Sequence, residues 1–161
     1  MSLERPYRIV LFGHRNLSAH EIVEKRLSDL LYEVARTEDL IEIYIGRNGE
    51  FDIFAASVVK RAKRALGSER IDLICVLPYE IKDLEYLEAY YDSIIYPISP
   101  QKTHPKAAIG LRNRWMAENA DLFVCYVERN QGGAYAAMQH ARKLGTKIVN
   151  LAEDREEFPL F

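Results

Sequence analysis

The sequence predicts an α/β fold, a three-layer Rossmann-like sandwich with a mainly parallel sheet, in a single domain spanning residues 1–161. Short apolar runs alternate with segments whose apolar residues recur every three or four positions, as strands alternate with helices in this class. Several of the runs are apolar without alternation, which is typical of parallel strands buried on both faces. The 161 residues, 48% of them hydrophobic, suffice for one domain with a substantial core.

Two strand–helix units make up the first part of the chain. A strand over residues 7–13 ends in glycine, and Ser18 then stands three residues before Glu21, the spacing of a helix capping box. The helix that follows places one apolar stripe toward the sheet: Val23, Leu27, Leu30, Leu31 and Val34. A second strand over residues 40–45 closes at Gly46. The next helix, from about Asp52 to Leu66, has as its inner residues Phe54, Ala55, Val58, Val59 and Ala62.

The alternation continues to the end of the chain. A strand over residues 71–77 stops at Pro78, an acidic, tyrosine-rich helical segment covers 80–91, and a short strand covers 93–96. Residues 97–106 hold three prolines without periodicity, which makes this loop a candidate ligand lid or edge crossover. The remaining expected elements are a helix over 107–119, a strand over 121–127, a helix up to Leu144 with Gly145 as its C′ residue, and a strand over 147–151.

The overall charge and the cysteines narrow the function classes. A formal charge of −2 offers no general attraction to nucleic acid or to an anionic membrane, so any anion site must be local and a nucleic-acid partner is not favoured. Cys75 and Cys125 lie in apolar strands and are expected to be inert core thiols. With no apolar run of bilayer length and no signal peptide at the start, we expect no membrane partner and a cytoplasmic location.

Glycines and polar residues directly follow four of the predicted strands. The loops beyond the carboxyl ends of parallel strands share one edge, and ligands bind where the strand order reverses. Glycine lets a phosphate approach the backbone, and a helix N-terminus offers free N–H groups and the positive end of its dipole. We therefore expect an anion site at this edge, although glycine here also serves ordinary turn geometry. The ligand-binding candidates are Gly13, His14, Arg15, Gly46, Gly49, Glu50, Gly132, Gly133 and Ala134.

An arginine-rich segment precedes the fifth strand. Arg112 could reach the same edge, where its guanidinium would match phosphate oxygens bidentately. The alternative is a solvated basic helix face with Trp115 packed in the core. The residues alone leave both interpretations open.

Four of these motifs together resemble the SLOG superfamily: Gly13-His14-Arg15, Gly49-Glu50-Phe51-Asp52, Arg112-Asn113-Arg114-Trp115-Met116 and Gly132-Gly133-Ala134. That superfamily groups the SMF/DprA DNA-processing proteins with the LOG, or lysine-decarboxylase-like, proteins and with small stand-alone relatives. The resemblance spans nearly the whole chain and is best with the stand-alone group. It implies a Rossmann-like fold whose glycine turns and Arg112 bind a nucleotide or nucleotide-derived ligand.

The sequence departs from the LOG pattern where catalysis would need it. The LOG phosphoribohydrolase motif continues with a glycine, a threonine and a glutamate, whereas here Gln139 stands in the position of the glutamate. An amide cannot act as a general acid, so the LOG reaction is disfavoured unless Glu50 or Asp52 substitutes. DprA-like proteins bind single-stranded DNA through a basic surface. This chain offers only a basic stretch on its second helix, a pattern typical of a solvated face: Lys60, Arg61, Lys63 and Arg64.

The acidic and histidine candidates each have two interpretations. Glu50 and Asp52 could bind ribose hydroxyls, yet Asp52 is equally well placed to cap the second helix. His14 could hydrogen-bond a base or ribose, or could be a turn histidine in water. The four histidines lack the spacing of a metal site, so no metal is expected. P-loop and dinucleotide-binding motifs are absent, and we expect no cofactor.

Three functions follow from these patterns. The first is the binding or sensing of a nucleotide-derived small molecule without clear catalytic machinery; the second is a LOG-like nucleoside-monophosphate N-glycosidase; the third is single-stranded DNA binding, against which the acidic balance counts. Whether the protein is an enzyme stays open, with the lack of a glutamate at position 139 favouring a binding protein. Tyrosines clustered in residues 79–96 favour a homo-oligomer interface, or else pack their rings over the sheet.

Overall fold

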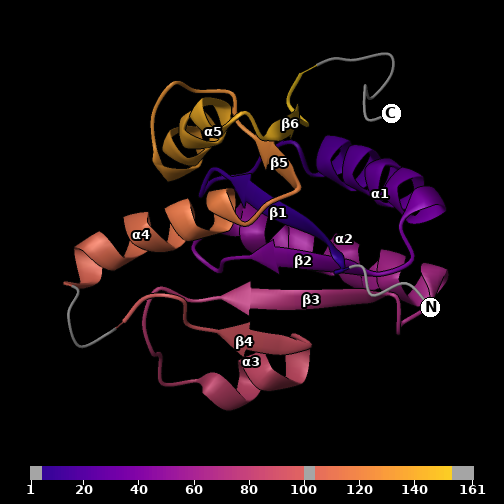
Figure 1. Cartoon of the computed structure of the whole chain (residues 1–161), viewed down its shortest axis with the longest axis horizontal. Helices are drawn as coiled ribbons and strands as arrows, with labels where there is room; N and C mark the ends of the chain where they lie inside the picture. The colour runs from indigo at the N-terminus through magenta and orange to yellow at the C-terminus, as the bar shows by residue number, and fades with distance from the viewer. Residues whose placement is uncertain (1–4, 100–103, 154–161) are drawn as a thin grey trace.

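The computed structural model describes residues 5–99 and 104–153, in which six parallel strands form one sheet with helices on both faces (Figure 1). The strands are β1 (Tyr7–Gly13), β2 (Ile41–Ile45), β3 (Ile71–Val76), β4 (Ser93–Ile95), β5 (Leu122–Tyr126) and β6 (Lys147–Asn150). The helices are α1 (His20–Thr37), α2 (Glu50–Leu66), α3 (Leu84–Tyr90), α4 (Pro105–Glu118) and α5 (Gly133–Leu144). The predicted three-layer α/β architecture is confirmed.

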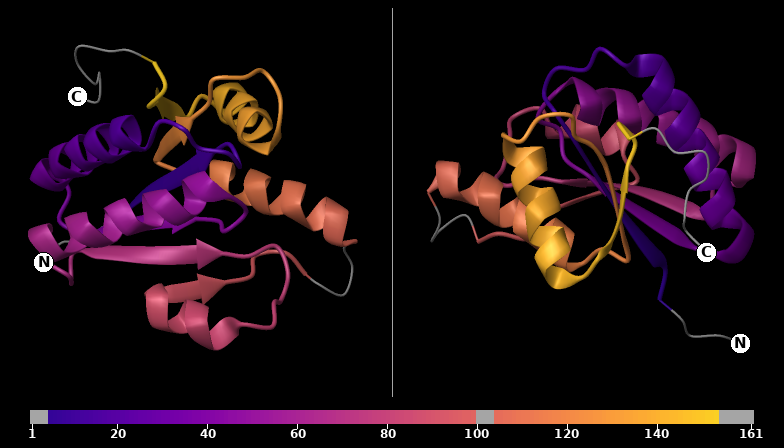
Figure 2. Two further views of the ribbon diagram at one scale, coloured as in Figure 1. Left: turned by 180° about the vertical axis from the view of Figure 1, so that it is seen from behind. Right: turned by 90° about the horizontal axis from the view of Figure 1, so that it is seen from above.

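Two apolar layers sandwich the sheet because successive strand residues point to opposite faces. On β1, Ile9 and Leu11 pack with the inner faces of α1 and α2, whereas Val10 and Phe12 pack with α4 and α5. Figure 2 shows the two helix layers from behind and from above. All four β1 residues are at least nine-tenths buried, so this strand is the centre of the core.

The starts of two helices differ from the prediction. The capping box at Ser18 is wrong, because Ala19 occupies the N-cap of α1 and no side chain caps it. Helix α2 begins at Glu50 with Gly49 as its N-cap, so Asp52 lies inside the first turn and does not cap the helix. The earlier start extends the predicted inner face by one turn, because Phe51 lies four residues before the buried Ala55. Phe51 is fully buried, whereas Phe54 is half-buried.

The other boundaries agree within a few residues. Helix α3 covers only Leu84–Tyr90 of the expected 80–91. Helix α4 begins at Pro105, where the ring nitrogen Nδ1 of His104 accepts a hydrogen bond from the Lys106 N–H. The expected C′ glycine of α5 is confirmed, because Gly145 has the left-handed φ of 75°. Of the candidate lid over residues 97–106, positions 100–103 lie outside the described residues.

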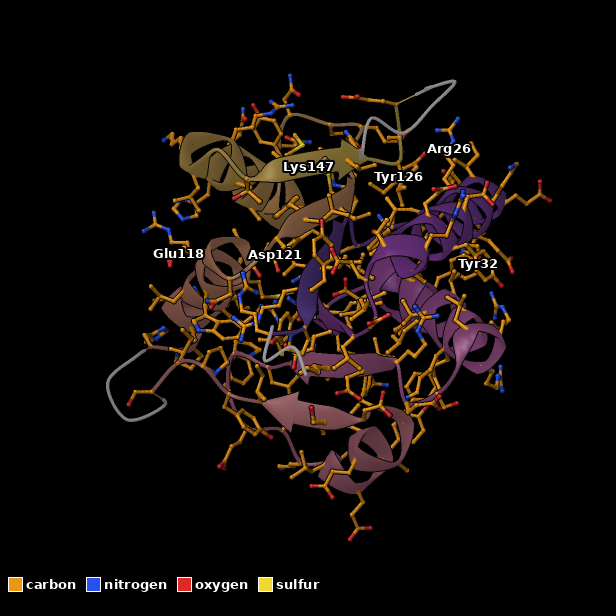
Figure 3. All side chains as sticks on the ribbon, turned by 45° about the vertical axis from the view of Figure 1, so that its right-hand side comes forward. Arg26, Tyr32, Glu118, Asp121, Tyr126 and Lys147 are labelled. Carbon is orange, nitrogen blue, oxygen red and sulfur yellow. The ribbon has the colours of Figure 1, made fainter. Side chains whose placement is uncertain are left out.

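The strand order β4-β3-β2-β1-β5-β6 reverses between β1 and β5. From β1 the chain passes to β2, β3 and β4 on one side, and the α4 crossover then brings β5 to the other side. At the amino end of this strand pair lies Asp121, which is labelled in Figure 3. Its carboxylate accepts a hydrogen bond from the Arg8 N–H and pairs with Arg5 at 2.7 Å. The carboxyl end of the same pair is therefore where a crevice is expected.

Among the residues described, no helix is both long and apolar enough to span a membrane.

Candidate functional site

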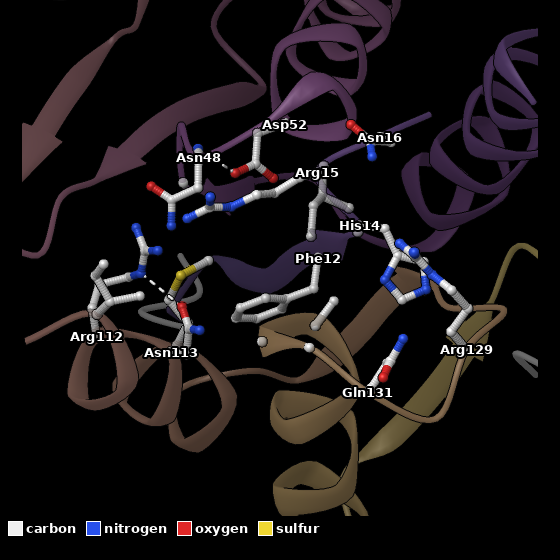
Figure 4. Close-up of a pocket in the computed structure, with 18 residues that line it drawn as sticks. Phe12, His14, Arg15, Asn16, Asn48, Asp52, Arg112, Asn113, Arg129 and Gln131 are labelled. Atoms are coloured by element: carbon white, nitrogen blue, oxygen red, sulfur yellow. Dashed lines mark hydrogen bonds between the residues drawn. The ribbon is translucent and has the colours of Figure 1, made fainter. Parts of the chain in front are cut away.

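A cavity of about 520 Å³ opens at the carboxyl ends of β1 and β5, where the strand order reverses (Figure 4). The chain leaves β1 toward α1 on one face and leaves β5 toward α5 on the other, so the two loops separate and leave the space between them. The turn after β2 and the middle of α4 close the other sides. Its lining residues are Leu11, Phe12, Gly13, His14, Arg15, Asn16, Gly46, Asn48, Asp52, Ile109, Arg112, Asn113, Met116, Arg129, Gln131, Gly132, Gly133 and Ala134.

The entrance of α5 forms one wall of the cavity. Gly132 is the N-cap with a φ of 94°, a conformation that L side chains rarely adopt, and a Cβ on it would meet no atom within 4 Å. The first N–H groups of a helix have no acceptor inside the helix, and they lie at the positive end of its dipole. Gly132, Gly133 and Ala134 therefore present unpaired backbone donors to the cavity.

Gly13, the last residue of β1, is a glycine for a different physical reason. A Cβ on Gly13 would overlap the ring of Phe51, which is fully buried between α2 and the sheet. Gly49 likewise allows close contact between two loops, because its Cβ would lie 2.5 Å from the Arg15 Cα, and the Glu50 N–H donates to the Arg15 carbonyl at 2.7 Å. These two glycines are required by packing, not by the approach of a ligand.

His14 bridges the two sides of the crevice. Its side chain is 6% exposed, and Nε2 accepts a hydrogen bond from the Glu128 N–H at 3.1 Å. Burial, together with the nearby positive charge of Arg129, lowers the pKa of the imidazole, which favours the neutral ring that this acceptor role needs. The alternative of a turn histidine in water is wrong.

Arg112 is buried in the wall with 2% of its surface exposed. Its Nη1 donates to the Val76 carbonyl at 2.7 Å, and its Nε donates to Asn113 Oδ1 at 2.8 Å. Desolvation lowers the pKa of its guanidinium, against the opposing charge of Asp52. The alternative of a solvated basic face is wrong at this position, since α4 turns Arg112 inward.

Asp52 is the acidic group of the cavity. Its Oδ2 accepts a hydrogen bond from the Asn48 N–H at 2.9 Å. A Cβ on Gly46 would lie 3.2 Å from this oxygen and 2.8 Å from Arg112 Nη1, so both side chains occupy the space beside that glycine. Burial raises the pKa of the Asp52 carboxyl to about 6, although the hydrogen bond from Asn48 and the charge of Arg112 oppose the rise. A carboxyl with that pKa is half protonated at about pH 6.

Two exposed arginines face the same space without partners. Within residues 5–99 and 104–153, neither Arg15 nor Arg129 has a side-chain hydrogen bond or ion pair. Figure 4 shows them on opposite sides of the cavity, Arg15 beside Asn48 and Arg129 beside His14. Unpaired guanidinium groups at the mouth of a concave site attract anions.

Two of the predicted site residues do not line this cavity. Gly49 packs against Arg15, and the Glu50 carboxylate accepts a hydrogen bond from the Leu17 N–H at 2.9 Å and borders a separate apolar groove. Of the two catalytic candidates, only Asp52 therefore faces the cavity. The other predicted site residues come together there: Gly13, His14, Arg15, Gly46, Arg112, Gly132, Gly133 and Ala134.

The cavity also contains residues that were not among the predicted ligand-binding candidates. Arg129 and Gln131 lie in the polar loop after β5, which the sequence placed at this edge of the sheet. Asn113 was part of the arginine-rich motif but carried no signal of its own. Phe12, Ile109 and Met116 supply apolar surface, and they were indistinguishable from ordinary core residues.

The basic stretch on α2 is largely neutralised. Lys60 donates to the Tyr90 carbonyl and lies 3.8 Å from the centre of that ring, Arg61 pairs with Glu24 at 2.9 Å, and Lys63 pairs with Asp92 at 2.6 Å. This helix therefore does not present four free cations.

No metal site and no oligomer contact can be assigned from the described part of the chain. Residues 5–99 and 104–153 contain no group of three histidines, cysteines or carboxylates able to hold a metal ion. Among the clustered tyrosines, Tyr86 is 60% exposed, whereas Tyr91 is buried in the core, so the cluster serves both interpretations. A homo-oligomer remains a prediction.

Comparison with solved structures identifies DNA processing proteins as similar in fold. No protein-family model matches the chain, and no curated protein matches its sequence. DprA from Streptococcus pneumoniae superposes with a TM-score of 0.66 at 17% identity, over 89% of this chain and 49% of that one. DprA from Helicobacter pylori, described by its single-stranded DNA binding mode, superposes with a TM-score of 0.62 at 15% identity, over 89% of this chain and 64% of that one. The chain thus spans about half to two-thirds of these proteins, and it shares the Rossmann-like fold of DprA.

Proposed function

We propose that this chain binds a nucleotide or nucleotide-derived ligand in the cavity between β1 and β5, as a small stand-alone member of the SLOG group. The observation that carries the proposal is the convergence of Arg15, Arg129 and the entrance of α5 on one space. Two unpaired guanidinium groups and free backbone N–H groups together suit a phosphate.

The remaining walls suit the rest of a nucleotide. A volume of about 520 Å³ is in the range of small-molecule sites, and Phe12, Ile109 and Met116 provide apolar surface for a base. Asn48, Gln131 and Asp52 supply hydrogen-bonding groups for a base or a sugar. The cavity therefore combines an anionic subsite with apolar and polar surfaces of the kind a nucleoside needs.

The first experiment measures binding by calorimetry and thermal shift. AMP, GMP, CMP and UMP are compared with their nucleosides, using the wild type and the variants Arg15→Gln, Arg129→Gln and Arg64→Gln. We expect at least one monophosphate to raise the melting temperature, and each cavity variant to weaken its binding about tenfold, as loss of a charge-assisted hydrogen bond does. Arg64 lies on α2 outside the cavity, so Arg64→Gln should bind like the wild type. Stabilisation by no ligand, or equal binding by all variants, would reject the proposal.

Single-stranded DNA is the second candidate, and the DprA structures favour it because one is described by its single-stranded DNA binding mode. Three of the four α2 cations already have partners within the protein. We therefore assign such binding to the rim of the cavity, with Arg15 and Arg129. Affinity for a 20-residue oligothymidylate should then far exceed that for a monophosphate and fall steeply with salt, because several phosphates release counterions. A mononucleotide ligand shows a much weaker salt dependence.

Incubation of the protein with the same four monophosphates tests the N-glycosidase alternative. Asp52 would have to supply the acid in place of the missing glutamate, because the Glu50 carboxylate lies outside the cavity, where it accepts a hydrogen bond from the Leu17 N–H. Release of free base from a monophosphate, abolished in Asp52→Asn, would make the protein an enzyme. Intact monophosphates after prolonged incubation would leave it a binding protein.

A further inference from the structure

Arg112 donates two hydrogen bonds to groups of the protein itself. Nη1 donates to the Val76 carbonyl at the end of β3, and Nε donates to the side chain of its neighbour Asn113. These two bonds hold the guanidinium in place in the cavity wall. In the described residues no fully buried side-chain nitrogen lacks a partner, so Nη2, which makes no hydrogen bond, must border the cavity.

The bond to Nε decides which way the amide of Asn113 faces. A guanidinium N–H can only donate, so the atom 2.8 Å from Nε must be the amide oxygen of Asn113. The NH₂ group is therefore on the other side of the amide. It has no partner in the part of the chain that the structure describes.

That NH₂ group lies against the entrance of α5. The Cβ that Gly133 lacks would be 3.4 Å from Asn113 Nδ2, which places the amide nitrogen beside the first residue of the helix. Figure 4 shows the Arg112–Asn113 bond as a dashed line, with the amide on the cavity side of α4. A side-chain donor on α4 and the backbone donors of α5 therefore border one place in the cavity.

We propose that Asn113 donates a hydrogen bond to the phosphate of the ligand at the entrance of α5, and that Arg112 is a positioning residue that holds the amide in the donating orientation. The proposal rests on the proposed function and names the phosphate subsite within it. It assigns two α4 residues different roles: Asn113 contacts the ligand through Nδ2, and Arg112 acts partly through Asn113.

Asn113→Asp separates these roles. Aspartate keeps an oxygen for Arg112 Nε, so the fold and the melting temperature should be retained, but it replaces the NH₂ group by a carboxylate oxygen that repels phosphate. We expect affinity for the monophosphate that binds wild type best to fall at least about tenfold, with little change for its nucleoside. Asn130→Asp is the matched control, because Asn130 is exposed and lies outside this cavity, in the loop before α5. The substitution adds the same negative charge as Asn113→Asp.

Arg112→Lys tests the positioning role. Lysine keeps the positive charge but lacks the Nε donor, so the amide is free to turn. The ratio of monophosphate to nucleoside affinity should fall, and circular dichroism checks that the variant folds. An unchanged ratio in Arg112→Lys would remove the positioning role.

The outcomes also separate this proposal from the proposed function. If the wild type binds a monophosphate and Asn113→Asp binds it equally well, or loses the nucleoside to the same extent, the phosphate subsite at Asn113 is wrong while the proposed function stands. If the wild type binds no monophosphate and no inorganic phosphate, both are wrong.

Discussion

The two glycine turns that border the cavity use glycine for different physical reasons. Gly13 ends β1 without a Cβ because the Phe51 ring fills that place, whereas Gly132 has open space around it and a φ of 94°. The first glycine serves the core, and the second shapes the entrance of a helix that faces the cavity. Only the second turn is evidence for a ligand, although both read alike in the sequence.

The comparison predicts the largest effect for Gly13→Ala. The added methyl group overlaps the fully buried Phe51, so the core must shift, and we expect the free energy of unfolding to fall by about 3 kcal/mol. Urea unfolding measures it. Phe51→Leu in the Gly13→Ala background should recover part of the loss, and a loss below about 1 kcal/mol would show that the ring can move aside.

Asp52 tests the cavity in a different way from the two glycines. It lines the cavity, and burial disfavours the charged form of its carboxyl. Its pKa is raised from 3.8 to about 6, so as the pH rises from about 4 to about 6 the unfolded chain releases this proton before the folded protein does. Stability contributed by the protonated group is present below pH 4 and lost by about pH 6. Asp52→Asn should remove this loss and be more stable than the wild type by about 3 kcal/mol at pH 7, because a rise in pKa from 3.8 to about 6 corresponds to that free energy.

Urea unfolding at pH 4, 5, 6 and 7 measures the difference between wild type and Asp52→Asn. The lowered pKa of His14 produces the opposite slope, since it favours stability at higher pH, but it is present in both proteins and cancels in the difference. A difference that is the same at every pH would mean that Asp52 is not the titrating group.

Gly132→Ala should have a smaller effect than Gly13→Ala. No atom obstructs the methyl group, so only the backbone conformation opposes it: φ 94° and ψ 173° lie in a region that is essentially restricted to glycine. We expect a loss of about 2 kcal/mol in the free energy of unfolding. Thermal unfolding compares the two variants. A loss as large as that of Gly13→Ala would mean that the turn after β5 is also needed for packing.

Gly133→Ala should have the smallest effect on stability. The methyl group would lie in ordinary contact with Asn113 Nδ2, and alanine favours a helix over glycine by up to about 1 kcal/mol, so stability should be unchanged or raised. Because the methyl group enters the cavity beside the proposed phosphate subsite, monophosphate affinity should fall severalfold. Calorimetry measures it, and unchanged affinity would place the ligand away from the entrance of α5.

Much of the fold could be predicted from local patterns. The apolar stripe of α1 and the unbroken apolar runs of β1 and β5 encode their elements directly, because burial on one helix face or on both sheet faces imposes its own periodicity. The helix starts were less predictable. At α2, Gly49 takes the N-cap, for which Asp52 was one of the two interpretations, since the Glu50 N–H donates a hydrogen bond to the Arg15 carbonyl of another loop.

The candidate site was predicted only in outline. Residues after β1, β2 and β5 meet because parallel strands end at one edge, and this is why His14, Gly46 and Gly132 share a cavity. The orientation of single side chains was not predictable. Glu50 and Asp52 are two residues apart on α2, yet the first bonds Leu17 outside the cavity and the second faces Arg112 within it.

The sequence alone determined that this protein is a parallel α/β sandwich with glycine turns at one edge, because periodicity and turn residues act over short stretches of chain. The tertiary structure decided which turns enclose a space and which are packed shut, which arginine is buried and which two are free, and which way the amide of Asn113 faces. Those properties depend on contacts between residues far apart in the sequence, such as Arg112 with Val76 and Gly13 with Phe51, that no local pattern records.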